Sequence, residues 1–206
     1  MISEKRFSKK GKFEIAMVGR SNVGKSSIVR ELTGHKVRVG RRPGVTLKPT
    51  AVRRSDLVVT DHPGFGFMSG VKERKQDIVK NKIVRNFEKN ASEISLAILV
   101  IDAPSFVDVV RRWESRGEIP IDIEMFDFLA ELEIDTIIVP NKMDKIENKD
   151  ESLDEIISKF GLLQPWTKWK YIIAPTSAKK GDIRSLKALI RERLHVLKRD
   201  DLLKHL

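Results

Sequence analysis

The amino-acid sequence predicts a three-layer α/β domain, in which helices cover both faces of a mostly parallel six-stranded sheet with one antiparallel strand. Three observations support this prediction. Short apolar runs typical of buried strands alternate with segments whose apolar residues recur at helical spacing. A glycine-containing turn joins the first apolar run to the first helical segment. The length of 206 residues suits one such domain and its core.

The first strand is expected at residues 13–18 and the first helix at residues 26–32, with Gly34 ending that helix. Between them the chain reads GRSNVGKS, which fits the phosphate-binding pattern G-x-x-x-x-G-K-[ST]. The alternative, a glycine turn with an incidental lysine, is disfavoured by the flanking strand and helix. The predicted phosphate-binding residues are Gly19, Arg20, Ser21, Asn22, Val23, Gly24, Lys25, Ser26 and Ser27.

This phosphate-binding loop (P-loop) suits a polyphosphate because a helix N-terminus and several backbone N–H groups point toward one place. Gly19 and Gly24 allow the backbone to approach the ligand without a Cβ atom. Lys25 is expected to reach the β- and γ-phosphates as a catalytic residue, and the Ser26 hydroxyl is expected to bind Mg²⁺.

Residues 36–46 are rich in Arg, Lys, Gly and Pro and are expected to form a loop. Thr46 in this loop is a candidate second Mg²⁺ ligand and catalytic residue, whose backbone N–H would sense the γ-phosphate. An ordinary loop threonine is an equally open alternative. The predicted nucleotide-binding residues here are Gly44, Val45, Thr46, Leu47 and Lys48.

A strand at residues 57–60 is expected to run into Asp61-His62-Pro63-Gly64, all four of which are predicted to lie at the nucleotide. An aspartate at the carboxyl end of a strand beside a P-loop is positioned to hold Mg²⁺, here through a water molecule. Gly64 would donate its backbone N–H to the γ-phosphate and is the third predicted catalytic residue. A β-turn with Asp and Gly at favoured positions is the alternative.

The second half of the chain continues the alternation of helices and strands. Val79, Ile83 and Phe87 form the apolar stripe of the first helix in this half and are interpreted as core. Elements are expected at residues 72–90 (helix), 94–101 (strand), 106–132 (one or two helices broken at Gly117 and Pro120), 134–140 (strand), 151–160 (helix), 169–173 (strand) and 183–197 (helix).

The sequence N-K-x-D follows the strand at residues 134–140 and points to a guanine base. Guanine presents N1–H and an N2 amino group side by side, and the Asp144 carboxylate can accept from both, whereas adenine would leave it unpaired. A charged turn is the alternative. The Asn141 side chain is expected to tie the loop to its neighbours, the Lys142 stem to cover the base, and the Ala178 N–H to reach guanine O6. The predicted base-binding residues are Asn141, Lys142, Met143, Asp144, Thr176, Ser177 and Ala178.

Composition indicates a soluble globular protein of the cytoplasm. The chain has no Cys, and no apolar run approaches the roughly 18 residues of a spanning helix, so no membrane role is expected. The net charge of +11 is uneven: residues 1–90 hold 22 Lys/Arg and 8 Asp/Glu, and residues 91–206 hold 18 and 21. A basic surface of this kind favours RNA over a merely solvated face. We expect a basic arm at 1–12, the nucleotide-binding domain at 13–197 and a basic tail at 198–206, in a monomer.

These motifs, in this order, resemble the EngB (YihA) family of ribosome-associated GTPases over roughly residues 13–195. The match rests on GRSNVGKSS, PGVT after a basic loop, DHPGFGF and NKMD. The segment 103–125 differs from bacterial members and is more similar to archaeal ones. The resemblance implies a Ras-like GTP-binding domain, binding of GTP and GDP with Mg²⁺, a role in assembly of the large ribosomal subunit through rRNA or ribosomal proteins, and a link to cell division and septation.

Two further expectations concern catalysis. Residue 65 is Phe where many small GTPases carry a Gln that orients water, so slow intrinsic turnover is expected. Asn22 is a candidate ligand for a K⁺ ion that would replace a missing arginine finger, as in related GTPases. Two alternatives stay open: a nucleotide switch on RNA or a ribosomal protein with negligible turnover, and an ATP-dependent kinase or transporter ATPase, which would have no reason to carry N-K-x-D.

Overall fold

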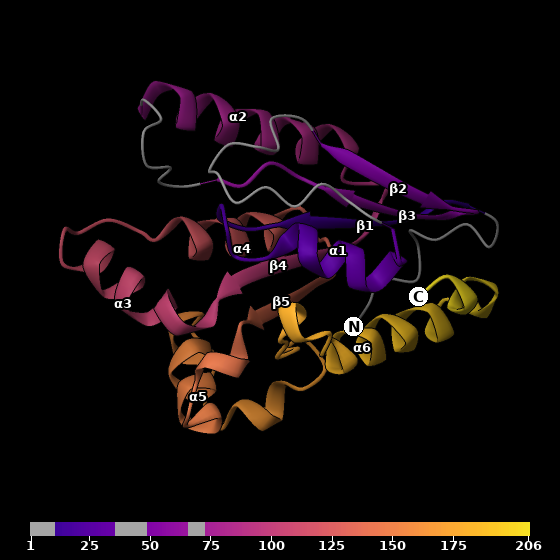
Figure 1. The fold of residues 1–206 in the computed structure, drawn as a ribbon. Coiled ribbons are helices and arrows are strands. Elements are labelled where there is room, and N and C mark those ends of the chain that lie inside the picture. Colours follow the sequence, from indigo (N-terminus) through magenta and orange to yellow (C-terminus); the bar gives the residue numbers. More distant parts are fainter. Residues whose placement is uncertain (1–10, 36–48, 66–72) are drawn as a thin grey trace.

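In the computed structural model, the described residues are 11–35, 49–65 and 73–206, without the side chains of residues 73–77 and 79. Strands and helices alternate through most of this part of the chain (Figure 1). The strands are β1 Phe13–Val18, β2 Thr50–Arg54, β3 Leu57–Asp61, β4 Ile94–Asp102 and β5 Thr136–Asn141. The helices are α1 Lys25–Thr33, α2 Glu73–Asn90, α3 Ala103–Glu114, α4 Ile121–Glu131, α5 Lys149–Lys159 and α6 Arg184–Val196. Short 3-10 helices lie at Met143–Lys145, Trp166–Trp169, Ala178–Lys180 and Asp200–His205.

The five strands form one sheet in the order β2-β3-β1-β4-β5. Only β2 runs antiparallel, paired with β3, while β1, β3, β4 and β5 are parallel. Because the carboxyl ends of parallel strands lie at one edge of a sheet, the segments that follow β1, β3, β4 and β5 meet there. The mostly parallel sheet with one antiparallel strand is confirmed, with five strands rather than six.

The predicted sixth strand at residues 169–173 was wrong, and backbone chemistry explains why. Ile173 forms a single parallel bridge with Ile138, made by the Ile138 N–H to the Ile172 carbonyl and the Ala174 N–H to the Ile138 carbonyl. After the bridge, the Thr176 N–H bonds to the Pro140 carbonyl, but the proline has no N–H to complete that rung. Before the bridge, the N–H groups of Ile172 and Ile173 turn back to the Trp169 carbonyl.

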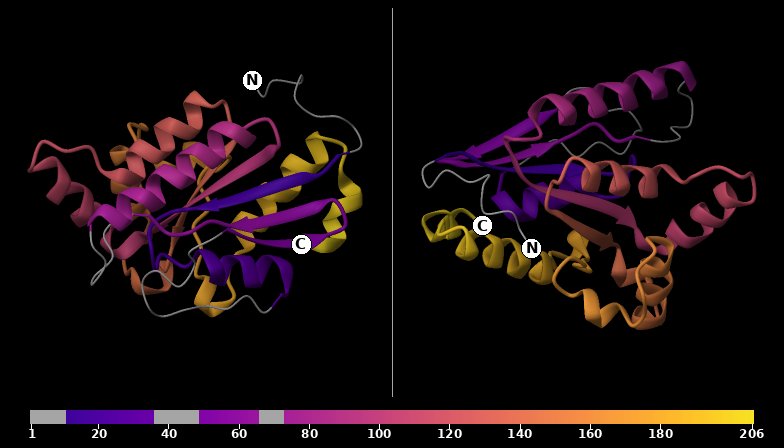
Figure 2. Two further views of the ribbon diagram at one scale, coloured as in Figure 1. Left: turned by 90° about the horizontal axis from the view of Figure 1, so that it is seen from above. Right: turned by 180° about the vertical axis from the view of Figure 1, so that it is seen from behind.

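Helices cover both faces of the sheet, as the alternation of buried strand residues requires. On one face, Ile28 and Leu32 of α1 and Leu186 and Leu194 of α6 pack on strand residues such as Ile15. On the other face the cluster joins residues of α2, α3, α4 and α5: Ile83, Phe87, Phe106, Val110, Met125, Leu129 and Ile156. The three layers are visible from two further sides in Figure 2.

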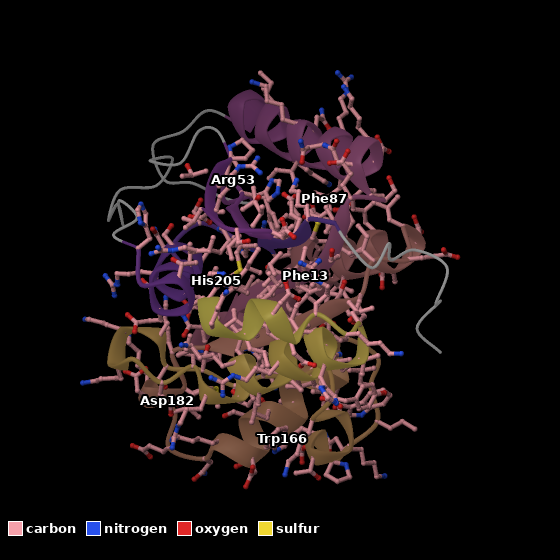
Figure 3. The ribbon with its side chains drawn as sticks, turned by 90° about the vertical axis from the view of Figure 1, so that its right-hand side faces the viewer. Phe13, Arg53, Phe87, Trp166, Asp182 and His205 are labelled. Atoms are coloured by element: carbon pink, nitrogen blue, oxygen red, sulfur yellow. The ribbon has the colours of Figure 1, made fainter. Side chains whose placement is uncertain are left out.

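The stripe predicted for the first helix of the second half is confirmed in part. Ile83 and Phe87 are buried, whereas the side chain of Val79 lies outside the described part. Seen from the edge in Figure 3, Phe87 lies beside α2, and Trp166 lies on the opposite side of the molecule, beyond α6.

Helix α1 ends at the glycine predicted to end it. Gly34 adopts a left-handed φ of 65°, and its N–H bonds to the Arg30 carbonyl.

The segment after α6 packs back onto the domain. Leu202 is 1% exposed in the core cluster that contains α1 and α6. The Arg199 guanidinium lies 3.1 Å from Asp56, in the turn between β2 and β3, and also donates to the Gly11 carbonyl. In the described ranges, none of the helices has the length and apolarity that a membrane crossing demands.

Candidate functional site

The P-loop takes a backbone path that only glycine allows at two positions. Gly19 has φ +140°, and a Cβ atom there would lie 2.2 Å from the Val100 carbonyl oxygen. Gly24 has φ +108°, and its Cβ atom would lie 2.2 Å from Nδ2 of Asn141. The loop therefore packs directly against β4 and against Asn141 at the end of β5. Ser27 lies in the first turn of α1, whose N-terminus the loop leads into.

Lys25 begins α1 and bends back over the loop. Its Nζ donates to the carbonyl oxygens of Gly19 and Arg20, at 2.8 Å each. Burial lowers the pKa of Lys25 to about 8, although the carboxylates of Asp61 and Asp122 act in the opposite direction. The ammonium group thus lies in a poorly hydrated site, where an anionic ligand would stabilise its charge.

Ser26 and Asp61 bring two oxygen ligands together at the carboxyl end of β3. The Ser26 hydroxyl donates to Oδ2 of Asp61 at 2.5 Å, and Oδ1 of Asp61 is buried without a partner among the described residues. Burial raises the pKa of Asp61, and the Ser26 hydrogen bond opposes that rise. A hydroxyl with a carboxylate is a ligand pair suited to Mg²⁺, which binds one or two carboxylates and completes its shell with phosphate and water.

The four residues Asp61 to Gly64 do not all face the P-loop. Gly64 does, since a Cβ atom on it would lie 2.7 Å from the Ser21 nitrogen. The His62 ring instead lies on the other face of the sheet, 5.0 Å from the Phe87 ring, and burial lowers the pKa of His62 to about 4. Pro63 is also buried. The geometry thus gives no role at the phosphates to the His62 side chain.

Phe65 is buried in the core cluster under α2 and is 1% exposed. Its backbone forms a parallel bridge with Arg20, in which the Ser21 N–H bonds to the Phe65 carbonyl at 3.2 Å and the Phe65 N–H to the Gly19 carbonyl at 3.4 Å. Phe65 therefore connects the chain after β3 to the P-loop through its backbone, while its ring supports the core.

Asn141 joins the two ends of the site. Its Nδ2 donates to the Val23 carbonyl in the P-loop at 2.8 Å. Its Oδ1 accepts from the Thr176 hydroxyl at 3.1 Å and from the Ala178 N–H at 3.0 Å. Because Asn141 is only 3% exposed, all three bonds are shielded from water. One buried amide thus fixes the P-loop against the two segments predicted to read the base.

The segment after Asn141 is held in a tight turn. Lys142 has a left-handed φ of 68°, and its Nζ lies 2.6 Å from Oδ2 of Asp102 at the end of β4. The Met143 N–H bonds to the Thr176 carbonyl at 3.1 Å. The Asp144 side chain is exposed and forms no hydrogen bond within the ranges that the structure describes. Its carboxylate is therefore free to accept from a ligand.

The structure thus brings together the P-loop, Asp61, Gly64, Asn141–Asp144 and Thr176–Ala178. Gly44, Val45, Thr46, Leu47 and Lys48 lie outside the described residues, so their assignment stays a prediction. Sequence reasoning missed Asp102, although a carboxylate at the end of β4 is expected at the same edge as the P-loop. It also missed Asp122, because no local sequence pattern predicts its contact with Arg20.

Comparison with known proteins agrees with this geometry. The family model described as a 50S ribosome-binding GTPase matches residues 14–142. A probable GTP-binding protein EngB of Methanosarcina barkeri is 64% identical over 195 residues, which cover 94% of this chain and 93% of the relative. A crystal structure of a probable GTP-binding protein engB is 42% identical with a TM-score of 0.79, covering 89% of this chain and 99% of that chain.

A more distant solved structure shows the same domain inside a longer protein. Era, in complex with MgGDPNP and nucleotides 1506–1542 of 16S ribosomal RNA, is 27% identical with a TM-score of 0.59. The match covers 92% of this chain and 57% of the Era chain. The identity of the M. barkeri relative, its coverage of nearly the whole chain and the assembled P-loop together show that this chain belongs to the EngB family of GTP-binding proteins, which are P-loop GTPases.

Proposed function

We propose that the protein is a Mg²⁺-dependent GTP-binding switch that hydrolyses GTP and acts in assembly of the large ribosomal subunit. The observation that carries the nucleotide part is the Asn141 amide, which bonds the P-loop carbonyl of Val23 and the Ala178 N–H at once. A phosphate-binding loop and a base-reading loop fixed to each other suit one ligand that has both a triphosphate and a guanine.

The phosphates would bind at the N-terminus of α1, against the backbone N–H groups of the P-loop. Lys25 would exchange its hydrogen bonds with the carbonyls of Gly19 and Arg20 for bonds to the β- and γ-phosphates. The phosphate charge would favour the ammonium form and offset the effect of burial on this group. Lys25 and the P-loop amides would then stabilise the charge that develops as water attacks the γ-phosphate in line.

Mg²⁺ fits the chemistry of Ser26 and Asp61, and Thr46 is the proposed further ligand. The unpartnered Oδ1 of Asp61 would accept from a metal-bound water, and the Ser26 hydroxyl would release Asp61 Oδ2 to face the ion. When bound, the ion neutralises charge on the β- and γ-phosphates.

At the other end, Asp144 would accept from guanine N1–H and the N2 amine, and the Lys142 stem would lie over the base. The Asp102 carboxylate holds the Lys142 ammonium and so fixes the direction of that stem. The Ala178 N–H already donates to Asn141, so it can reach guanine O6 only as a shared donor.

Hydrolysis would be slow, because the Phe65 ring lies in the core and cannot orient water. The exposed Asn22 has a left-handed φ of 68° and remains the candidate K⁺ ligand. Single-turnover GTP hydrolysis measured in KCl and in NaCl tests this, since equal rates would remove the K⁺ proposal. If hydrolysis stays negligible with large ribosomal subunits present, the protein is a binding switch rather than an active hydrolase.

The ribosomal role rests on the family description as a 50S ribosome-binding GTPase, on the rRNA in the complex with Era, and on the basic first half of this chain. The resemblance to the family also implies a link to cell division and septation. The test has two stages. Competition of GTP, GDP and ATP for the purified protein is expected to exclude ATP; equal binding of ATP would refute the guanine assignment.

The second stage is a pull-down of ribosomal particles with GDP, GTP or a non-hydrolysable analogue over a range of salt concentrations. Association with large subunits is expected to depend on the nucleotide and to fall steeply with salt, as phosphate contacts require. Retention that is the same with every nucleotide would contradict a switch, and no association in any state would contradict the ribosomal role.

A further inference from the structure

Asp122 is a buried carboxylate beside the P-loop that the nucleotide chemistry above does not use. It lies in the first turn of α4 and is 1% exposed. Oδ2 lies 3.5 Å from Nη1 of Arg20, and neither carboxylate oxygen has a closer hydrogen-bond partner in the described part of the chain. A buried charge is costly unless it is compensated, so the position of this pair calls for a reason beyond stability.

The partner of Asp122 holds two parts of the phosphate site through its backbone. The Arg20 carbonyl accepts one of the two hydrogen bonds from Lys25. The same residue forms the backbone bridge to Phe65, where the chain leaves β3 for the segment that begins at residue 66. Fixing the Arg20 side chain therefore restrains both the resting place of the Lys25 ammonium and the attachment of the chain after Gly64.

The charges around the loop are balanced by this carboxylate. Arg20 and Lys25 are the cations there, and Asp61 and Asp122 are the anions that act on Lys25. Asp61 is expected to turn toward Mg²⁺, which leaves Asp122 as the group that occupies Arg20. Without it, the Arg20 guanidinium, which is only 19% exposed, would be unpaired and free to swing toward Asp61 or the phosphates.

We propose that Asp122 is a positioning residue for the phosphate-binding loop, which it holds through Arg20. This inference rests on the proposed nucleotide site, but it concerns a residue of α4 that reaches the loop only through another side chain. The same turn of α4 offers a matched control: Glu124 pairs with Lys80 of α2 at 2.7 Å on the surface, where an ion pair contributes little.

The test compares Asp122→Asn with Glu124→Gln in the full chain. Asp122→Asn is expected to weaken GDP and GTP binding about 10-fold, the size of a coupling of about 1.4 kcal/mol, and Glu124→Gln by less than about 2-fold. Arg20→Gln removes the other member of the same ion pair, the residue that is partly exposed. It replaces Asp122→Asn in the binding measurement if the Asp122→Asn protein does not fold. In the Arg20→Gln background, Asp122→Asn is expected to add less than about 2-fold.

Amide hydrogen exchange of residues 19–25 without nucleotide gives a second readout, and Asp122→Asn is expected to speed it while Glu124→Gln does not. An Asp122→Asn protein with wild-type affinity and wild-type exchange would overturn the inference, as would a full 10-fold loss that persists in the Arg20→Gln background. If the wild-type protein binds no guanine nucleotide, the proposed function fails, and the exchange measurement still decides whether Asp122 holds the loop.

Discussion

The two ends of the nucleotide site differ in how their polar groups are held. At the phosphate end, Lys25 bonds to backbone carbonyls and Ser26 bonds to Asp61, so each group already has a partner that a ligand must displace. At the base end, Asn141 fixes the backbone from behind, and Asp144 stands exposed without a partner among the described residues. The ammonium and hydroxyl groups of the phosphate end are thus satisfied internally, whereas the acceptor of the base end is open and preformed.

This difference assigns separate tasks to the two ends. A preformed acceptor discriminates between bases, because a wrong ligand leaves it unpaired and no rearrangement can rescue it. The Lys25 ammonium and the Ser26 hydroxyl would respond instead to charge. Each already makes hydrogen bonds, which only a polyphosphate with its metal ion would replace with interactions of comparable strength. In the proposed function, base selectivity therefore belongs to the base end, and the response to ligand charge belongs to the phosphate end.

The largest effect should come from Asp144, where a change sharpens the contrast. Asp144→Asn replaces an acceptor by an amide that donates to the xanthine carbonyl, so preference should shift from GTP to XTP. We expect GTP affinity to fall about 1,000-fold, or about 4 kcal/mol, because two hydrogen bonds to a charged group are lost at about 1.5–3 kcal/mol each. Competition of both nucleotides for the purified variant measures this.

The control for Asp144→Asn is Asp127→Asn, an exposed aspartate on α4 that lies outside the site. It should keep the selectivity of the wild-type protein. Unaltered base preference in Asp144→Asn would remove Asp144 from the base site and leave the free carboxylate without a function.

Asn141→Ala should break the connection between the two ends. It removes one donor and one acceptor that together bond Val23, Thr176 and Ala178, and it leaves those groups unpaired in a buried place. We expect a loss of about 3 kcal/mol in the free energy of unfolding, together with weaker binding of both GDP and GTP. Denaturant unfolding and nucleotide titration measure the two effects.

Asn81→Ala, an exposed change on α2, should stay within about 0.5 kcal/mol of the wild-type protein. Should Asn141→Ala retain both its stability and its affinity, the phosphate end and the base end would be independent of each other.

The smallest effect concerns a proton on His62, which follows β3 but lies on the face of the sheet opposite the phosphate end. Burial lowers the pKa of His62 to about 4 from an ordinary value of 6.5, so below pH 6.5 the unfolded chain binds a proton that the folded chain refuses. Stability from this residue is present above pH 6.5 and is lost as pH falls toward 4. The loss should be about 2 kcal/mol between pH 7 and pH 4.5.

Denaturant unfolding of His62→Gln over this pH range should show a shallower decline than the wild-type protein. His35→Gln, at an exposed histidine whose side chain forms no hydrogen bond or ion pair among the described residues, is the matched control and should follow the wild-type curve. An unchanged slope in His62→Gln would mean that this ring takes up a proton in the folded state.

Local patterns were sufficient for most of the fold and for the residue types at the site. Apolar periodicity located β1, α1 and β4, and the glycine pattern located the P-loop, because these signals depend on neighbours in sequence. The sixth strand failed because an apolar run does not reveal that the chain turns before Ile173, where the N–H groups of Ile172 and Ile173 bond to the Trp169 carbonyl.

Features made by distant residues were beyond such reasoning. The contact between Arg20 and Asp122 joins the P-loop to α4, and neither residue belongs to a pattern that names the other. The side of the sheet taken by His62 was also missed, because a motif gives order along the chain, whereas the alternation of β3 decides that Asp61 and His62 point to opposite faces.

The close approach of Gly24 to Asn141 has a consequence for substitutions of Gly24. A methyl group at residue 24 would collide with the amide that organises the far end of the pocket, 2.2 Å from Nδ2. An alanine at residue 24 should therefore lower stability and weaken binding of both GDP and GTP, as loss of the Asn141 side chain should, although the altered residue belongs to the P-loop. Variants of Gly24 and of Asn141 should accordingly fall into one phenotypic class.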